Sequence, residues 1–233
     1  LSPVDGRKIW RSDMGLLDDL KKQAELAKTQ QMSAQSLQEA TVKTVESKMK
    51  QSFQYLHELL KQLSVLKPVN PLNFSVPGIV ELKNLQYVDS FIDNRKKRIN
   101  DLEVMDITTF YIKWGSGNKI TLERDMPAPA QKIREGLNQF AVKYAEEEMR
   151  SPRGTIAGWR FLIDQAINTD VRIKADHEQP RLLISARNLI RLGTDEFVVP
   201  AEDITEAWLE EFAKTLLGQM SAFTKYRVQT PLR

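Results

Sequence analysis

The densest group of chemically versatile side chains in this sequence is a basic run of four residues: Arg95, Lys96, Lys97 and Arg98. Adjacent cations can bind the phosphates of nucleic acid or of lipid head groups. Three carboxylates flank the run, however, and no aromatic side chain is interleaved to stack on a base: Asp89, Asp93 and Asp101. The run therefore fits a solvated strand edge better, where Lys and Arg discourage pairing with other chains. Arg181, Arg187 and Arg191 extend the basic patch only if the fold brings them together.

Side chains that commonly perform catalysis are scarce. Cys is absent, which excludes disulfides, thiolate metal sites and cysteine nucleophiles. The two histidines, His57 and His177, are too few for a three-histidine metal site and lie far apart in the sequence. His57 is expected beside a helical seam, and His177 in a solvated turn rather than in a metal or proton-transfer site. We predict no catalytic, cofactor-binding or metal-binding residue, and no enzyme.

Composition is that of an ordinary globular protein. Of 233 residues, 41% are hydrophobic and 28% are charged, and 34 Lys or Arg against 31 Asp or Glu leave a formal net charge of +3. This mild excess permits an acidic partner without requiring one. No apolar run approaches the length that spans a bilayer. We therefore expect a soluble, cytoplasmic protein.

The elements that must position these residues begin with a long helix. Residues 16–67 contain neither Pro nor Gly, and a straight helix over them would reach roughly 78 Å. Its second half carries apolar residues at alternating spacings of three and four, interrupted only by Ser52: Val42, Val45, Met49, Leu56, Leu59, Leu63 and Leu66. This heptad-like seam requires a partner helix or another apolar surface.

The first half of this helix carries a weaker apolar stripe in another heptad register. The stripe comprises Leu17, Leu20, Ala24, Ala27 and Ala34, with Gln31 in the same series. The register shifts within residues 29–37, so either one helix rolls its apolar face there or two helices fold back as a hairpin. Because no Gly or Pro marks a turn, a continuous helix is favoured.

Prolines at 68, 71 and 77 end the helical region, and the period then changes towards that of strands. Apolar alternation over residues 110–122 around Gly115-Ser116-Gly117-Asn118 predicts a hairpin. A helix is expected from about residue 127 to 149. Residues 155–167 satisfy both periods, and strand is favoured over helix. Short strands then lead to an amphipathic helix over residues 200–217.

The predicted fold is therefore α+β. It has a long N-terminal, coiled-coil-like helical extension followed by an antiparallel sheet domain with two amphipathic helices. Residues 1–13 are expected to be a leader, 14–67 a helical stalk, 68–78 a Pro-rich linker, 79–218 the α+β domain and 219–233 an extended tail. The two halves after Gly78 resemble each other as β-β-β-α units, and duplication and coincidence explain this about equally well.

The sequence favours a non-catalytic interaction or assembly protein that oligomerises or docks through its N-terminal helices, either with itself or with another protein. The alternative is a protein that binds an anionic ligand, nucleic acid or a membrane surface, through Arg95–Arg98. Neither reading implies a cofactor.

Overall fold

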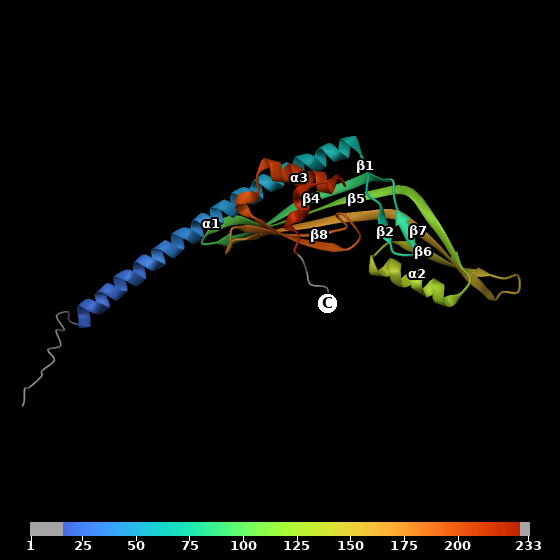
Figure 1. The fold of residues 1–233 in the computed structure, drawn as a ribbon, viewed down its shortest axis with the longest axis horizontal. Helices are drawn as coiled ribbons and strands as arrows, with labels where there is room; N and C mark the ends of the chain where they lie inside the picture. Colours follow the sequence, from blue (N-terminus) through green and yellow to red (C-terminus); the bar gives the residue numbers. More distant parts are fainter. Residues whose placement is uncertain (1–15, 229–233) are drawn as a thin grey trace, which may run out of the picture.

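The computed structural model describes residues 16–228 and consists of a long helix followed by a curled antiparallel sheet (Figure 1). The elements are α1 (Leu16–Leu66), β1 (Val69–Asn70), β2 (Phe74–Val76), β3 (Val80–Leu82), β4 (Leu85–Ile99), β5 (Leu102–Arg124), α2 (Pro127–Gln139), β6 (Tyr144–Arg150), β7 (Ile156–Asp176), β8 (Arg181–Arg187), β9 (Thr194–Pro200), the 3-10 turn η1 (Ala201–Asp203), α3 (Glu206–Leu216) and the 3-10 turn η2 (Ala222–Tyr226).

The N-terminal helical extension is confirmed as one helix, α1, which is uninterrupted over 51 residues. The first part of α1 extends away from the sheet, and the second part lies along it beside α3 (Figure 1). Within residues 16–228, no helix has the length and apolar character needed to cross a membrane. The leader expected at residues 1–13 lies outside the described residues.

The main sheet is antiparallel, with its strands in the order β1-β4-β5-β7-β8-β9, and β6 pairs with the first half of β7. Two strands, β5 and β7, are more than twenty residues long and form the longest ladder. Buried and exposed side chains alternate along both strands. In the part that lies under α1 and α3, this alternation separates an inner face, packed on those helices, from an outer face.

The hairpin predicted around Gly115–Asn118 is wrong, because the chain continues through these residues as the single strand β5. The residues between Gly115 and Lys119 form an irregularity in the ladder with β7, where the register shifts. Gly117 has a φ of +73°, a conformation that glycine adopts without steric cost. The sequence signal of a turn therefore marks a bulge, which bends a long strand and increases its twist.

The helix predicted up to about residue 149 is too long. It ends at Gln139, and Tyr144–Arg150 forms strand β6. In this strand Glu146 accepts a bidentate contact from Arg134 of α2, so glutamates that resembled a helix surface line a strand. The strand favoured for residues 155–167 is confirmed as the first half of β7. The two β-β-β-α halves are not confirmed, since α2 follows β5 whereas α3 follows β6 to β9.

The segments expected to be a linker and an extended tail also carry structure. Within residues 68–78, β1 pairs with β4 and β2 pairs with β3. Within the tail, η2 places the ring of Phe223 in the core, fully buried. The division of the chain into stalk and domain stays a prediction. Both parts contribute to one cluster of buried residues.

The second half of α1 packs on the inner face of the sheet. Val45, Met49 and Leu56 are fully buried in the same cluster as Phe110 and Trp114 of β5. Two polar contacts fix the helix where it reaches the sheet. Glu46 accepts a hydrogen bond from the backbone N–H of Met105 at 2.6 Å, and Lys48 donates to the carbonyl of Ile204 at 2.6 Å. The helix is therefore held by packing and at two defined positions along the sheet.

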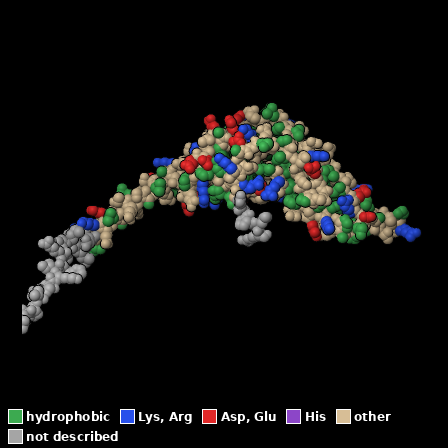
Figure 2. All heavy atoms as spheres, viewed as in Figure 1, with side chains coloured by type: hydrophobic (Ala, Val, Ile, Leu, Met, Phe, Trp, Pro, Cys, Tyr) green, Lys and Arg blue, Asp and Glu red, His purple; other side chains and the backbone are tan. Residues whose placement is uncertain are grey.

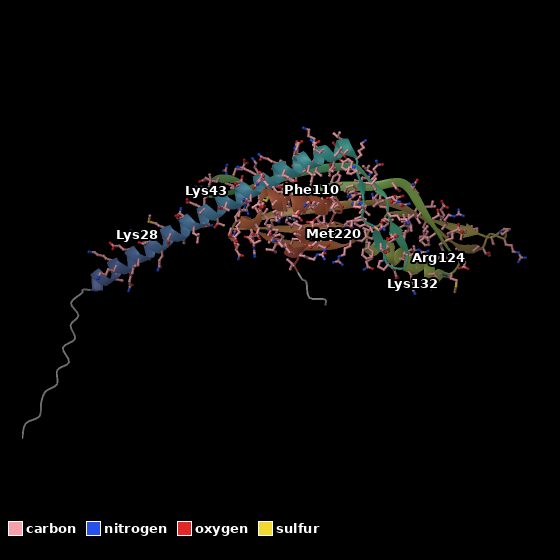
Figure 3. The ribbon with its side chains drawn as sticks, turned by 45° about the horizontal axis from the view of Figure 1, so that its top comes forward. Lys28, Lys43, Phe110, Arg124, Lys132 and Met220 are labelled. Atoms are coloured by element: carbon pink, nitrogen blue, oxygen red, sulfur yellow. The ribbon has the colours of Figure 1, made fainter. Side chains whose placement is uncertain are left out.

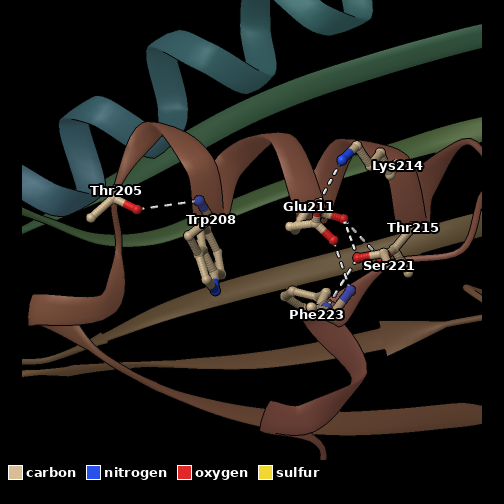
Figure 4. Close-up of polar contacts among 8 residues, drawn as sticks. Thr205, Trp208, Glu211, Lys214, Thr215, Ser221 and Phe223 are labelled. Carbon is tan, nitrogen blue, oxygen red and sulfur yellow. Dashed lines mark hydrogen bonds and ion pairs between the residues drawn. The ribbon is translucent and has the colours of Figure 1, made fainter.

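The C-terminal helix α3 is stabilised by caps at both ends (Figure 4). At its start, the Thr205 hydroxyl accepts from the backbone N–H of Trp208 at 3.3 Å. Near its end, the Glu211 carboxylate accepts from the Lys214 ammonium at 2.6 Å and from the backbone N–H of Ala222 at 2.7 Å. These contacts hold the pKa of Glu211 down at about 2, with the bond from Lys214 as the largest cause. Glu211 thus ties η2 to α3.

The packing of α1 predicts the effect of truncating its buried side chains. Leu56→Ala removes a fully buried side chain from the core and should lower the free energy of unfolding by about 2–5 kcal/mol. The control is Leu37→Ala on the same helix, where the side chain is 71% exposed and the cost should stay below about 0.5 kcal/mol. Urea unfolding followed by circular dichroism measures both, and equal effects would show that α1 is not part of the core.

The Glu211 contacts predict a pH dependence of stability. Because the folded pKa lies below the ordinary value of 4.5, the contribution of Glu211 is fully present above pH 4.5 and is lost as the pH falls towards about 2. Glu211→Gln should therefore lower the melting temperature at pH 7 and reduce its acid dependence in this window. Glu210→Gln removes the same charge from the neighbouring exposed position and is the control. If the melting temperatures of wild type and Glu211→Gln changed equally between pH 2 and 5, this would contradict the role assigned to Glu211.

Candidate functional site

The seam predicted on α1 divides into residues that the structure buries and residues that it leaves exposed. Five of its members lie in the core on the inner face of the sheet: Val42, Val45, Met49, Leu56 and Leu63. Leu59 is half-buried at the edge of the same cluster, and Leu66 is 72% exposed. Leu60, which the heptad pattern did not include, is buried. Most of the seam is therefore covered by the protein's own sheet.

The N-terminal part of α1 has no such cover. Every side chain from Leu20 to Ala40 is exposed, including the large apolar side chains of Leu26, Met32 and Leu37. We call residues 20–40 the projecting segment. At 1.5 Å per residue it is about 31 Å long. Lys28 lies on this segment, far from the sheet, whereas Lys43 lies where the helix reaches the sheet (Figure 3).

One face of the projecting segment continues the buried face of α1. At 100° per residue, this face falls within a sector of about 80°, the sector that also contains Met49, Leu56 and Leu63. We call its residues the projecting stripe: Leu20, Ala24, Ala27, Gln31, Ala34 and Gln38. The face that packs on the sheet is therefore presented to solvent once the helix passes the end of the sheet.

The apparent register shift within residues 29–37 follows from this geometry. A heptad repeats every 3.5 residues, whereas a straight α-helix has 3.6 residues per turn, so a straight face drifts by about 20° per heptad relative to the repeat. The buried face of α1 follows the straight helix across the sheet. Residues on this face therefore point in one direction from the helix axis although they occupy different heptad positions. The shift in heptad register requires neither a hairpin nor a helix that rolls its apolar face.

The basic run at the end of β4 is partly neutralised by the neighbouring strand. Lys96 contacts Glu103 at 2.8 Å and Lys97 contacts Asp106 at 2.9 Å. The side chains of Arg95 and Arg98 have no hydrogen bond or ion pair with other residues of the described chain. Among the arginines that could have extended the patch, Arg181 is paired with Asp176 and Arg191 with Asp195. Binding of an anion at this run stays a prediction, which these ion pairs weaken.

The two histidines lie in different surroundings. His57 is exposed on α1 and stacks on Phe53, with ring centroids 6.1 Å apart. His177 is buried rather than in a solvated turn, and its Nε2 lies 3.1 Å from the carbonyl oxygen of Met105. Burial is the largest cause that lowers the pKa of His177. Its Nδ1 has no hydrogen-bond partner among the described residues.

The two histidines do not belong to a group that could hold a metal ion in the part of the chain that the structure describes. Residues 16–228 contain no group of three or more His, Asp or Glu side chains placed to hold a metal ion. Comparisons of the chain with protein-family models, with curated proteins and with solved structures found no match. What the described chain does present is two exposed surfaces, the projecting segment of α1 and the outer face of the sheet.

The sequence reasoning missed one such surface, the outer face of the sheet. Along β7, Asp170, Arg172 and Lys174 are exposed, and the apolar residues between them are buried. This strict alternation is a signal that the sequence contained, because it places consecutive charges of one strand on one face. What the sequence could not show is which residues of neighbouring strands share that face.

Proposed function

We propose that this protein is a non-catalytic assembly protein that self-associates through the projecting segment of α1. The observation that carries the proposal is an exposed helical segment of 21 residues, 20–40, that continues the buried face of the same helix. The second half of α1 is stabilised by the sheet. The projecting segment receives no such stabilisation from the described chain.

A helix of this kind requires additional stabilisation. Most helical stability in proteins comes from packing of an apolar face rather than from intrinsic propensity, and the projecting segment has no packed face within the described chain. Local contacts along the segment are few and exposed, such as the hydrogen bond from Gln35 to Glu39 at 3.2 Å. A partner that covers the projecting stripe would supply the missing packing.

The pattern of the stripe supports a second copy of this chain as the partner. Its residues alternate at spacings of four and three, which is the a and d pattern of a two-stranded coiled coil. Ala24, Ala27 and Ala34 have small side chains that let two helices approach closely. Gln31 occupies an a position, where polar side chains of two parallel copies face each other and fix the register. Gln38, at the next a position, lines a hollow beside the sheet together with Lys97 and His177.

The flanking charges favour the same parallel arrangement. Lys21 and Lys28 occupy e positions, and Gln23 and Gln30 occupy g positions. Parallel pairing places each g position near an e position of the other helix, so that Lys meets Gln. Antiparallel pairing brings e positions together, so that Lys approaches Lys, and like charges at close range are unfavourable.

Ala27→Glu tests this proposal because it places a carboxylate at a d position, opposite its own copy in the pair. Glu is a good helix former, and the site is exposed in the single chain, so the fold should be retained. We expect the dissociation constant of the dimer, measured by sedimentation equilibrium, to rise at least tenfold. The matched control is Ala40→Glu, which makes the same change about 140° away around the helix from Ala27.

Two outcomes would contradict the proposal. The first is a wild-type chain that stays monomeric up to millimolar concentration while circular dichroism shows the full helix content. The second is equal weakening by Ala27→Glu and Ala40→Glu, which would place the contact away from the projecting stripe.

A further inference from the structure

The outer face of the sheet, opposite α1 and α3, contains three hollows that join into one groove. Their volumes are about 430, 400 and 480 Å³. Asp170 and Arg187 line both the first and the second hollow. Arg172 and Ser185 line both the second and the third. We call this continuous depression, which crosses β5, β7, β8 and β9, the open-face groove.

Positive charge is concentrated in the open-face groove. Its lining contains three carboxylates, Asp164, Asp170 and Glu196, against six cations: Lys113, Lys119, Lys143, Arg172, Lys174 and Arg187. The excess of three equals the formal net charge of the whole chain. Figure 2 shows Lys and Arg side chains gathered over β8. The groove thus carries a local excess of positive charge that the chain's overall composition does not reveal.

Most of these cations are not neutralised by the part of the chain that the structure describes. The side chains of Lys113, Arg172, Lys174 and Arg187 make no hydrogen bond or ion pair with other residues of the range 16–228. Asp170 is the ladder partner of Arg187, but the carboxylate and the guanidinium do not form an ion pair.

The other end of the same face differs. There Arg160 contacts Glu123 at 2.8 Å and Glu147 at 3.5 Å. At this end of the outer face the arginine is paired with glutamates of the same chain. At the end that carries the groove, cations remain available to an anion.

Two aromatic rings, one of them exposed, line the middle hollow. Phe91 of β4 is 58% exposed and contacts Tyr111 of β5, with ring centroids 6.3 Å apart. The Tyr111 hydroxyl donates to Asp89 at 3.1 Å, which fixes the second ring. An exposed ring beside unpaired arginines is the arrangement on which single-stranded nucleic acids are bound, because bases stack on the ring and phosphates contact the cations.

We propose that the open-face groove binds single-stranded nucleic acid. Arg172, Arg187 and Lys174 contact phosphates along the groove, and an unpaired base stacks on Phe91. The hydroxyls of Thr109 and Ser185 line the same hollow and can bond to base edges. Those hydroxyls and Asp170 disfavour a lipid chain in the hollow, because hydrocarbon would leave them without hydrogen-bond partners. A duplex hides the faces of its bases and cannot use Phe91.

The experiment measures fluorescence anisotropy of labelled 12-nucleotide U and dT strands with the full chain at 50 and 200 mM salt. The double variant Arg172→Gln/Arg187→Gln should reduce the slope of log affinity against log salt by about 1.4, since each lost phosphate contact removes about 0.7. Phe91→Ala should weaken binding about 5- to 100-fold. Arg160→Gln is the matched control, because it removes an arginine of the same face that is already paired, and its affinity should equal that of the wild type.

Further arms decide between this ligand and others. Duplex DNA of the same length and vesicles containing 30% phosphatidylserine are titrated under the same conditions. Tighter binding of either, absence of binding to both single strands at 50 mM salt, or equal losses in Arg160→Gln and the double variant would each overturn the proposal. If the double variant fails to fold, as judged by circular dichroism, Lys113→Gln/Lys174→Gln replaces it with the same expected change in slope. The proposal does not depend on self-association, which is measured separately.

Discussion

Contact between the second half of α1 and the curled sheet is the interaction on which the rest of the structure depends. Val45, Met49 and Leu56 fill the inner face of the sheet together with the aromatic residues of β5 and α3. The sheet is covered by the helix, and the helix takes its position from the sheet through the Glu46 and Lys48 contacts. A long helix that is anchored along half of its length has a defined direction where it leaves the sheet.

That direction underlies the function proposed for the projecting segment. The apolar sector of α1 does not stop at the sheet, so in the proposed assembly the face that packs internally is also the face offered to another chain. Along this sector, the side chains change from large buried ones over the sheet to mostly alanines and glutamines in the projecting segment. Large apolar side chains suit a permanent core, and small and polar ones suit a contact between separately folded chains. The open-face groove lies on the opposite side of the sheet, so the proposed assembly through α1 would leave it uncovered.

Local patterns in the sequence predicted the helices and strands better than they predicted which of these elements pair or pack together. The long helix follows from 51 residues without Pro or Gly, and the amphipathic α3 follows from Ile204, Trp208 and Phe212. The hairpin at Gly115–Asn118 failed because a Gly-rich bulge and a turn have the same local composition, and only pairing with β7 distinguishes them. His177 was misplaced for a related reason, since its burial depends on Met105, a residue 72 positions away in the chain.

The candidate surfaces also show that local patterns are visible in the sequence whereas their partners in the fold are not. The seam on α1 was visible as a pattern, but its partner, the sheet of the same chain, was not. The cations of the groove come from β5, β7 and β8 and from the segment before β6, so no single stretch of sequence displays them together. The basic run was conspicuous in the sequence, yet two of its four members are held by Glu103 and Asp106. Unpaired charge depends on three-dimensional neighbours, which residue order alone does not specify.

Hydrogen exchange of the backbone amides of α1, followed by mass spectrometry at several protein concentrations, separates the half of the helix that the sheet holds from the half proposed to pair. Amides in residues 42–63 should exchange slowly at every concentration, because the sheet protects them. Amides in residues 20–40 should exchange quickly in dilute protein and slow down as the concentration rises, because pairing of the projecting segment stabilises its helix. Fast exchange of residues 20–40 at all concentrations, or fast exchange of residues 42–63 at any, would contradict this prediction.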